Sequence, residues 1–177
     1  MALLLARNEH FAVAITSVTA YANGLEFNLA VRTRRSLDPS VRRKVLGKFM
    51  VDEGVPSERL RLGVQFSDGR KATSLGVRQD RAETDPVLVE RGGGGGGRSW
   101  DSRFWLWPLP TPGAIAFVTE WPLAGIDLTR VEVDAEPILQ ASLQARELWP
   151  EEPDAPIESW TESTFTVGGR QTGESET

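Results

Sequence analysis

The sequence predicts a mostly β domain, either an antiparallel β-sandwich or an open barrel of about seven strands, with a C-terminal α-helix. Two observations lead to this fold class. Apolar and polar residues alternate over several short runs, as they do in half-buried strands, and clusters of Gly, Pro, Asn and Asp separate these runs. Helical spacing is confined to the stretch after residue 134 and to a short candidate helix over residues 39–50.

The first two strands are predicted to form a hairpin. Apolar residues alternate through residues 9–20 and again through residues 25–34. Between the two runs stands Asn23-Gly24, a residue pair that tolerates the positive φ angles of a tight hairpin turn. We therefore expect an antiparallel pair of strands joined by a turn of this type.

A charged connection follows the hairpin. Asp38-Pro39 can cap and open the short helix over residues 39–50. Alternation returns at residues 60–66, and Ser67-Asp68-Gly69-Arg70 turns the chain into a return strand at residues 71–75. This segment is expected to be a second hairpin.

The remaining strand candidates surround a run of glycines. In chain order they are a weak strand at 86–90 that enters Gly92–Gly97, a strand at Phe104–Trp107, a proline-rich turn at 108–113, a strand at 114–120 and a last short strand at Val131 and Val133. The strand at 114–120 is apolar at nearly every position, which is typical of a strand covered on both faces.

Asp134 is predicted to cap the C-terminal helix, with Glu136 and Pro137 in its first turn. The apolar stripe of this helix continues to Trp149-Pro150.

The negative charge of the chain lies at its C-terminal end. Residues 151–177 hold seven of the 25 acidic residues but only one of the 20 basic residues, and their apolar residues show no period. Such a segment buries too little apolar surface to offset the entropy of ordering it. We expect residues 1–149 to form a single β-rich domain and residues 150–177 a disordered acidic tail.

The chain has no cysteine, which excludes a disulfide framework and thiolate chemistry. No apolar run approaches the ~18 residues that span a bilayer, and no secretory signal is apparent at the N-terminus. These observations favour a cytoplasmic protein that does not contact a membrane.

Four strings carry a resemblance to other proteins. They are Leu62–Arg70 (LGVQFSDGR), the glycine run followed by Arg98 and Trp100, Trp107–Pro110 (WPLP), and Glu120-Trp121-Pro122 with Gly125-Ile126. Over residues 7–149 the chain resembles a group of uncharacterised bacterial (actinobacterial) proteins. The resemblance implies a shared fold and assigns no activity and no site.

The glycine run allows two interpretations. Consecutive backbone N–H groups can cradle an anion with the help of Arg98. A phosphate loop, however, needs a Lys-Ser/Thr pair and a helix directly behind it, whereas Arg98-Ser99 leads into an aromatic strand. We therefore expect a flexible or close-packed glycine-rich loop that joins strands.

The tryptophans offer the best functional signal. Trp100, Trp105, Trp107 and Trp121 surround one proline-rich turn, and exposed Trp platforms bind sugars or proline-rich peptides. The same residues can instead fill a small core. Because side chains alternate along a strand, we expect Phe104 and Leu106 to be core and Trp105 and Trp107 to be partly exposed beside the glycine loop.

Other groups of residues give only weak functional signals. A basic cluster at residues 32–48 has no nucleic-acid-binding motif around it, so we expect no nucleic-acid binding. His10, the only histidine, is expected at the surface, and no nucleophile motif accompanies it. Asp101, Glu120 and Asp127 are the only carboxylates considered for a glycosidase pair. We assign no catalytic residue, no metal ligand and no cofactor.

The sequence thus favours a non-catalytic protein-binding or scaffold module that contacts a protein partner through its Trp-rich region at 100–122, with Arg98, Trp100, Trp105, Trp107 and Trp121 as the binding residues. The alternative is a small-ligand-binding or enzymatic β domain acting on a sugar or a phosphorylated metabolite.

A chain that ends at Glu151 is expected to fold like the full chain, because the removed residues have no periodic apolar pattern. Thermal melts of the two chains test this expectation. A loss of more than ~1 kcal/mol on truncation would contradict it and would indicate docking through Trp160 or Phe165.

Overall fold

The computed structural model describes residues 2–38, 59–75 and 84–147. The chain divides into two units, Met1–Arg146 and Glu147–Thr177, and every described helix and strand lies in the first. The helix expected at 39–50 and the tail expected at 150–177 lie outside the described residues.

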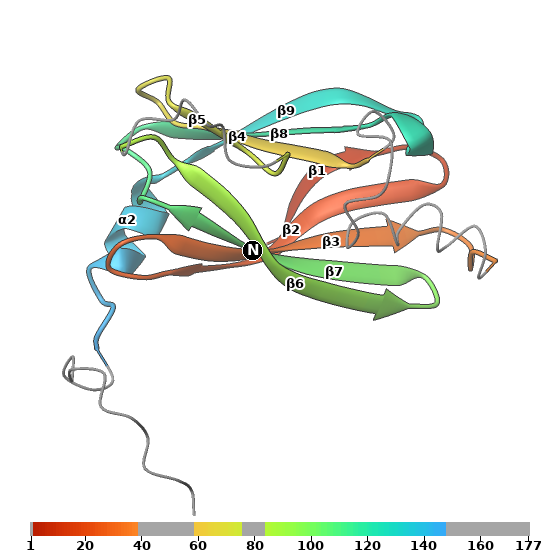
Figure 1. Cartoon of the computed structure of the whole chain (residues 1–177), viewed down its shortest axis with the longest axis horizontal. Helices are drawn as coiled ribbons and strands as arrows, with labels where there is room; N and C mark the ends of the chain where they lie inside the picture. Colours follow the sequence, from red (N-terminus) through yellow and green to blue (C-terminus); the bar gives the residue numbers. More distant parts are fainter. Residues whose placement is uncertain (1, 39–58, 76–83, 148–177) are drawn as a thin grey trace, which may run out of the picture. The chain divides into compact units, whose positions relative to one another are not determined.

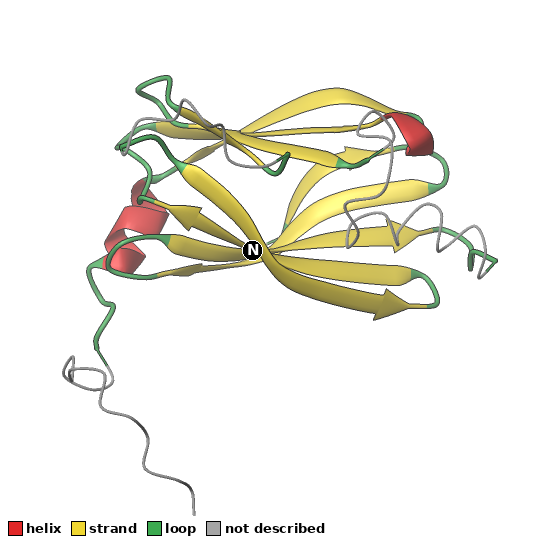
Figure 2. Ribbon diagram, in the orientation of Figure 1, coloured by secondary structure: helices red, strands yellow, loops and turns green. Residues whose placement is uncertain are grey.

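The described strands form two antiparallel sheets (Figure 1). Sheet A has the order β1 (Leu3–Arg7), β2 (Phe11–Ala20), β3 (Leu25–Thr33), β7 (Ser99–Trp107) and β6 (Val87–Gly96). Sheet B has the order β5 (Lys71–Thr73), β4 (Arg61–Gln65), β8 (Ala114–Trp121) and β9 (Ile126–Asp134). Two short helices, η3 (Pro122–Ala124) and α2 (Glu136–Ser142), stand at the ends of the layers (Figure 2).

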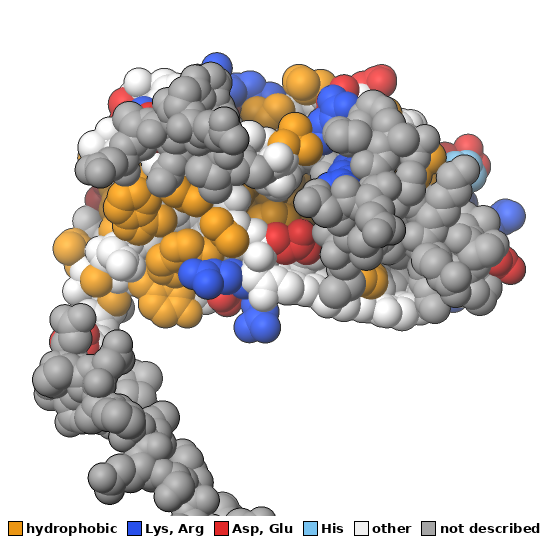
Figure 3. Space-filling view, viewed as in Figure 1, with side chains coloured by type: hydrophobic (Ala, Val, Ile, Leu, Met, Phe, Trp, Pro, Cys, Tyr) orange, Lys and Arg blue, Asp and Glu red, His pale blue; other side chains and the backbone are white. Residues whose placement is uncertain are grey.

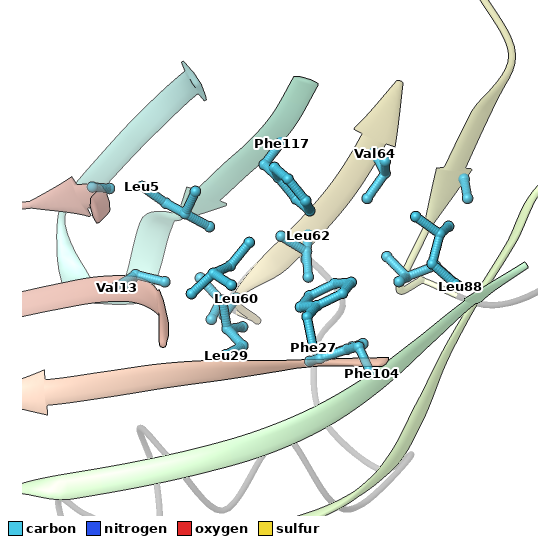
Figure 4. Close-up of a cluster of buried hydrophobic side chains, with 14 of the residues drawn as sticks. Leu5, Val13, Phe27, Leu29, Leu60, Leu62, Val64, Leu88, Phe104 and Phe117 are labelled. Atoms are coloured by element: carbon cyan, nitrogen blue, oxygen red, sulfur yellow. The ribbon is translucent and has the colours of Figure 1, made fainter. Parts of the chain in front are cut away.

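The hydrophobic core lies between the sheets. Phe27 of β3 stacks on Phe104 of β7 at 5.6 Å between ring centroids, and meets the edge of Phe117 of β8 at 5.5 Å. Figure 4 shows Phe27 and Phe104 pointing from one sheet toward Leu62 and Phe117 of the other. All four of these residues are at most 2% exposed. The predicted sandwich with a C-terminal helix is therefore confirmed, and the described strands do not close into a barrel.

Asn8 connects the two sheets at one end. It lies in the turn between β1 and β2, where its Oδ1 accepts a hydrogen bond from the backbone N–H of Phe11 at 2.9 Å. Its Nδ2 donates to the carbonyl of Ala124 in η3 at 2.7 Å. One amide side chain thus closes a turn of sheet A and holds it against the helical turn that ends β8.

The structure has nine described strands, more than the seven or so expected. Strand β1 was missed because Leu3-Leu4-Leu5 is a continuous apolar run, although only Leu5 is buried while Leu4 is 49% exposed. Strand β9 is longer than the Val131–Val133 strand expected, because most of its side chains are exposed and show little apolar alternation.

The C-terminal helix is shorter than expected, ending at Ser142 and not near Trp149. The Asp134 carboxylate accepts a hydrogen bond from the backbone N–H of Glu136 at 3.0 Å, so the predicted capping residue does bind the first turn, while the N-cap position itself is Ala135.

The turn between β2 and β3 also corrects an expectation. The hairpin is confirmed, but neither Asn23 nor Gly24 has a positive φ angle. The backbone N–H of Tyr21 donates to the Gly24 carbonyl at 2.8 Å and closes a longer turn. Gly24 is required for another reason, since a Cβ there would stand 2.6 Å from a ring atom of Trp105.

None of the described helices is long and apolar enough to cross a membrane.

Replacement of Leu106 by Ala should destabilise the domain by about 2–5 kcal/mol, because it empties a fully buried site between the sheets. Trp105→Ala should cost clearly less, since Trp105 is only partly buried. Urea unfolding of both variants measures the difference. Equal losses, or a larger loss for Trp105→Ala, would contradict the assignment of the two faces of β7.

Candidate functional site

Strand β7 separates core residues from surface residues by simple alternation. Phe104 and Leu106 are 2% and 0% exposed, respectively, whereas Trp105 and Trp107 are partly exposed. Phe104 lies opposite the buried Phe27 in the ladder between β3 and β7. The predicted division of this strand is confirmed, and the two tryptophans lie on the outer face of sheet A.

Four side chains form an aromatic patch on this face, which we define as Tyr21, Val89, Trp105 and Trp107. The rings of Tyr21 and Trp105 lie 5.4 Å apart, and Val89 is the partner of Trp105 in the ladder between β6 and β7. Tyr21 is 43% exposed and Val89 is 37% exposed. Figure 3 shows hydrophobic side chains gathered where the first half of β6 runs beside the last half of β7.

Trp105 is held in place by its surroundings. Its ring lies over Gly24, where there is no room for a Cβ, and Tyr21 flanks it. An aromatic side chain fixed in this way loses little conformational entropy when a partner covers it.

The other residues chosen from the sequence do not join this patch. Trp121 is 0% exposed and packs on Phe11 at 5.2 Å between ring centroids, so its assignment to a binding surface is wrong. Trp100 packs against the core, and its indole Nε1 donates to Ser102 Oγ at 3.1 Å. Arg98 is exposed in the turn between β6 and β7.

Trp105 and Trp107 also lie beside a different segment than expected. Their partners in β6 are Val89 and Val87, whereas the glycines pair with residues 99–103. The aromatic patch and the glycine run therefore occupy opposite halves of the β6–β7 hairpin.

The glycine run is a strand and not a loop. Gly92–Gly96 form the second half of β6 and pair in regular register with β7, and Gly97 begins the turn. Since successive N–H groups of a strand point in opposite directions, they do not converge on one anion, and the anion-cradle interpretation is wrong.

Close approach of two backbones explains two of the glycines. A Cβ at Gly93 would lie 2.5 Å from the carbonyl oxygen of Asp101, and a Cβ at Gly95 would lie 2.2 Å from that of Ser99. Gly92 and Gly97 have positive φ angles of 125° and 59°, which glycine adopts most easily. By contrast, a Cβ at Gly94 or Gly96 would meet no atom within 4 Å.

A polar network occupies the centre of the same outer face. Arg32 donates from Nη1 and Nη2 to the two carboxylate oxygens of Asp101 at 3.0 and 2.9 Å, and Asn28 Nδ2 donates to Asp101 Oδ1 at 3.0 Å. Burial tends to raise the pKa of Asp101, but these hydrogen bonds and the charge of Arg32 outweigh it and lower the pKa. Asp101 is thus held as a carboxylate by a bidentate partner and is unsuited to proton transfer.

Glu90 of β6 behaves in the opposite way. Partial burial raises the pKa of Glu90, and a hydrogen bond with the side chain of Ser102 opposes that rise only in part. The Ser102 hydroxyl also accepts the indole N–H of Trp100, so the carboxyl group belongs to a short polar chain at the margin of the core.

A cationic hollow lies at the far end of sheet A from the aromatic patch. It has a volume of about 550 Å³ and is lined by Arg7, Asn8, Glu9, His10, Phe11, Ala12, Arg32, Thr33 and Arg34. The Arg34 guanidinium lies 4.0 Å from the Glu9 carboxylate. Since Arg32 is paired with Asp101 and Arg34 lies near Glu9, Arg7 is the guanidinium of this hollow that has no carboxylate partner among the described residues, and it could attract an anion.

The carboxylates considered for glycoside hydrolysis are divided between the two sheets. Asp101 lies on sheet A, where Arg32 holds it. Glu120 on β8 and Asp127 on β9 lie on neighbouring strands of sheet B, at the irregularity that follows Thr119, and Glu120 forms an ion pair with Arg61 at 2.6 Å. Within residues 2–38, 59–75 and 84–147, no group of three His, Asp or Glu residues is arranged to hold a metal ion.

The sequence interpretation missed Tyr21, Val89 and the Asn28–Asp101–Arg32 network. The alternation along 25–34 already placed Asn28 and Arg32 on one face. The alternation could not predict the pairing of β3 with β7, which sets Asp101 beside these two residues. Local patterns contain no information on the pairing of distant strands.

Comparison of the chain with models of protein families, with curated protein sequences and with solved structures found no match.

Glycines of β6 that lie against the backbone of β7 should tolerate substitution less well than glycines that do not. Gly95→Ala should destabilise the domain by about 1–3 kcal/mol, because its Cβ meets the backbone of β7. Gly94→Ala should leave stability unchanged or raise it by about 0.5–1 kcal/mol, because the backbone is stiffened and nothing is displaced. Thermal or urea unfolding gives both values, and equal effects would refute the register of β6.

Glu90→Gln should stabilise the domain at neutral pH. A carboxyl group whose pKa is raised by folding stabilises the folded state at low pH and loses that contribution as pH rises through the folded pKa. The advantage of the variant should therefore shrink below the ordinary glutamic acid pKa of about 4.3. Urea melts at neutral and acidic pH measure this, and a pH-independent difference would contradict it.

Proposed function

We propose that the domain is a non-catalytic protein-binding module and that its contact surface is the outer face of sheet A around the aromatic patch. The observation that carries this proposal is the position of Trp105 and Trp107, which share the outer face while their neighbours Phe104 and Leu106 fill the core. A core role for these two indoles would have required them to face the other way.

The composition of the surface supports the proposal. Two tryptophans, a tyrosine and the exposed Arg103 lie on one sheet face, and Trp, Tyr and Arg are the residues that contribute most binding energy in protein interfaces. The fixed ring of Trp105 supplies a rigid anchor, and Arg103 supplies a charged neighbour. We place this binding activity in the cytoplasm, as the cysteine-free sequence favours.

A small anionic ligand in the cationic hollow is the second candidate function, in keeping with a phosphorylated metabolite. Its support is the position of Arg7, which has no carboxylate partner among the described residues, in a hollow of about 550 Å³ that Arg32 and Arg34 also line, a volume within the usual range of ligand sites. Titration with inorganic phosphate and pyrophosphate tests it, because binding that is lost in Arg7→Ala would favour this function.

Trp105→Ala should weaken binding of peptides selected by the full chain from a displayed library of random peptides. We expect a loss of at least about tenfold in affinity, as for a central aromatic anchor. Leu128→Ala, which truncates a side chain of β9 that is 65% exposed, is the matched control and should change nothing.

The opposite result is equally informative. Selected peptides that bind Trp105→Ala as well as the native chain would contradict the aromatic patch as the contact surface. Recovery of no peptide, together with binding of a sugar on a glycan array that depends on Trp105, would replace protein binding by sugar binding.

A further inference from the structure

Packing within the described part of the domain does not require glycine at two positions of β6. Gly94 and Gly96 face outward, opposite Asp101 and Ser99 in the ladder with β7, and a Cβ at either position would meet no atom within 4 Å. Glycine lowers strand stability relative to alanine. Within a strand it often marks a place where a ligand or another backbone comes close.

These glycines lie on a free sheet edge. Strand β6 is the last strand of sheet A in the described part of the chain, and Gly92–Gly96 are all exposed. In an antiparallel ladder, every second residue directs its N–H and C=O groups away from its neighbour, so this edge carries unpaired donors and acceptors. The bulge of β6 lies before Gly92, and the register from Gly92 to Gly96 is uninterrupted.

Within the ranges that the structure describes, the usual protections of a strand edge are missing along this half. Natural edges carry Lys, Pro or inward-pointing charges, whereas five consecutive glycines leave both faces bare. Figure 3 shows white atoms along the lower edge of the molecule where the end of β6 runs in Figure 1.

The charge around the edge is positive. Arg91 precedes the glycines, Arg98 follows them and Arg103 lies opposite Gly92, and all three side chains are exposed. Among the described residues none of the three forms an ion pair with a carboxylate, while Asp101 is already bound by Arg32. The bare outer sides of Gly92 and Gly94 leave the Arg103 side chain a clear path to the edge.

We propose that an extended acidic segment of a protein partner adds to the free edge of β6 along Gly92–Gly96 as a further strand of sheet A. This inference rests on the proposed protein-binding function and names the chemistry of the partner. Main-chain hydrogen bonds to the glycines supply the affinity, and acidic side chains pair with Arg91, Arg98 and Arg103. If the added strand continues past Arg91, it lies beside the aromatic patch, and its apolar side chains contact Trp105 and Trp107.

Three synthetic peptides test the proposal on the full chain by fluorescence anisotropy. The first alternates glutamate with valine, the second carries lysine in place of glutamate, and the third is the first with every second backbone amide methylated. We expect the acidic peptide to bind and the other two to bind at least about tenfold more weakly, because they lack the charge or the hydrogen-bond donors.

Two variants locate the site. Arg103→Glu should weaken binding of the acidic peptide, while Arg130→Glu on β9 of sheet B is the matched charge reversal and should have little effect. Gly94→Val should also weaken binding, since its side chain would stand on the outer face of β6 diagonal to Arg103, where acidic side chains of the peptide would meet that arginine. Its Cβ meets nothing in the folded domain, so a thermal melt should show the variant folded.

The outcomes separate this inference from the proposed function. Library-selected peptides that lose affinity in Trp105→Ala but tolerate amide methylation would leave the protein-binding function and overturn strand addition. Sensitivity to methylation and to Arg103→Glu without sensitivity to Trp105→Ala would support the edge and overturn the aromatic patch. If neither the acidic peptide nor any library peptide binds, both proposals are overturned.

Discussion

The register of β7 in sheet A is the constraint on which the rest of the structure depends. This strand pairs with β3 on one side and β6 on the other. Placing Phe104 opposite Phe27 sends Leu106 into the core as well, and a slip of one residue would exchange the two faces of the strand. The same register sets Asp101 beside Arg32 and brings the glycines of β6 against the backbone of residues 99–103. The core packing, the Asn28–Asp101–Arg32 network and the candidate binding site therefore all depend on the register of β7.

The two halves of the β6–β7 hairpin suit different tasks. At the end near the turn between β2 and β3, Trp105 is fixed over Gly24 and beside Tyr21, which gives a rigid apolar surface. Near the turn between β6 and β7, the glycines have no side chains, so the exposed surface is backbone. Exposed arginines surround it. In the proposed complex, the indoles would give a partner specificity and the glycines would give it main-chain hydrogen bonds.

Local alternation was enough to predict the sandwich and the direction of Phe104 and Leu106, because these depend only on period and burial. It could not separate Trp121 from Trp105, since both are indoles in strands and only the packing of the sheets buries the first. It also misread the glycine run, because glycine is rare in strands and its presence at Gly93 and Gly95 reflects the approach of β7, a contact between segments that no local pattern contains. Gly24 was identified correctly as a turn residue but for the wrong reason, since the ring of Trp105 and not a positive φ angle excludes a side chain there.

Amide hydrogen exchange of the full chain labelled with ¹⁵N-glycine tests the central claim most directly, because it observes the backbone of Gly92–Gly96 itself. If these residues form a strand paired only with β7, exchange should alternate along the run. Amides that donate to β7 should be protected, and the intervening amides, which face the free edge, should exchange rapidly. Uniformly rapid exchange from Gly92 to Gly96 would show a loop and would contradict the account, while uniform protection would show that the edge is already occupied.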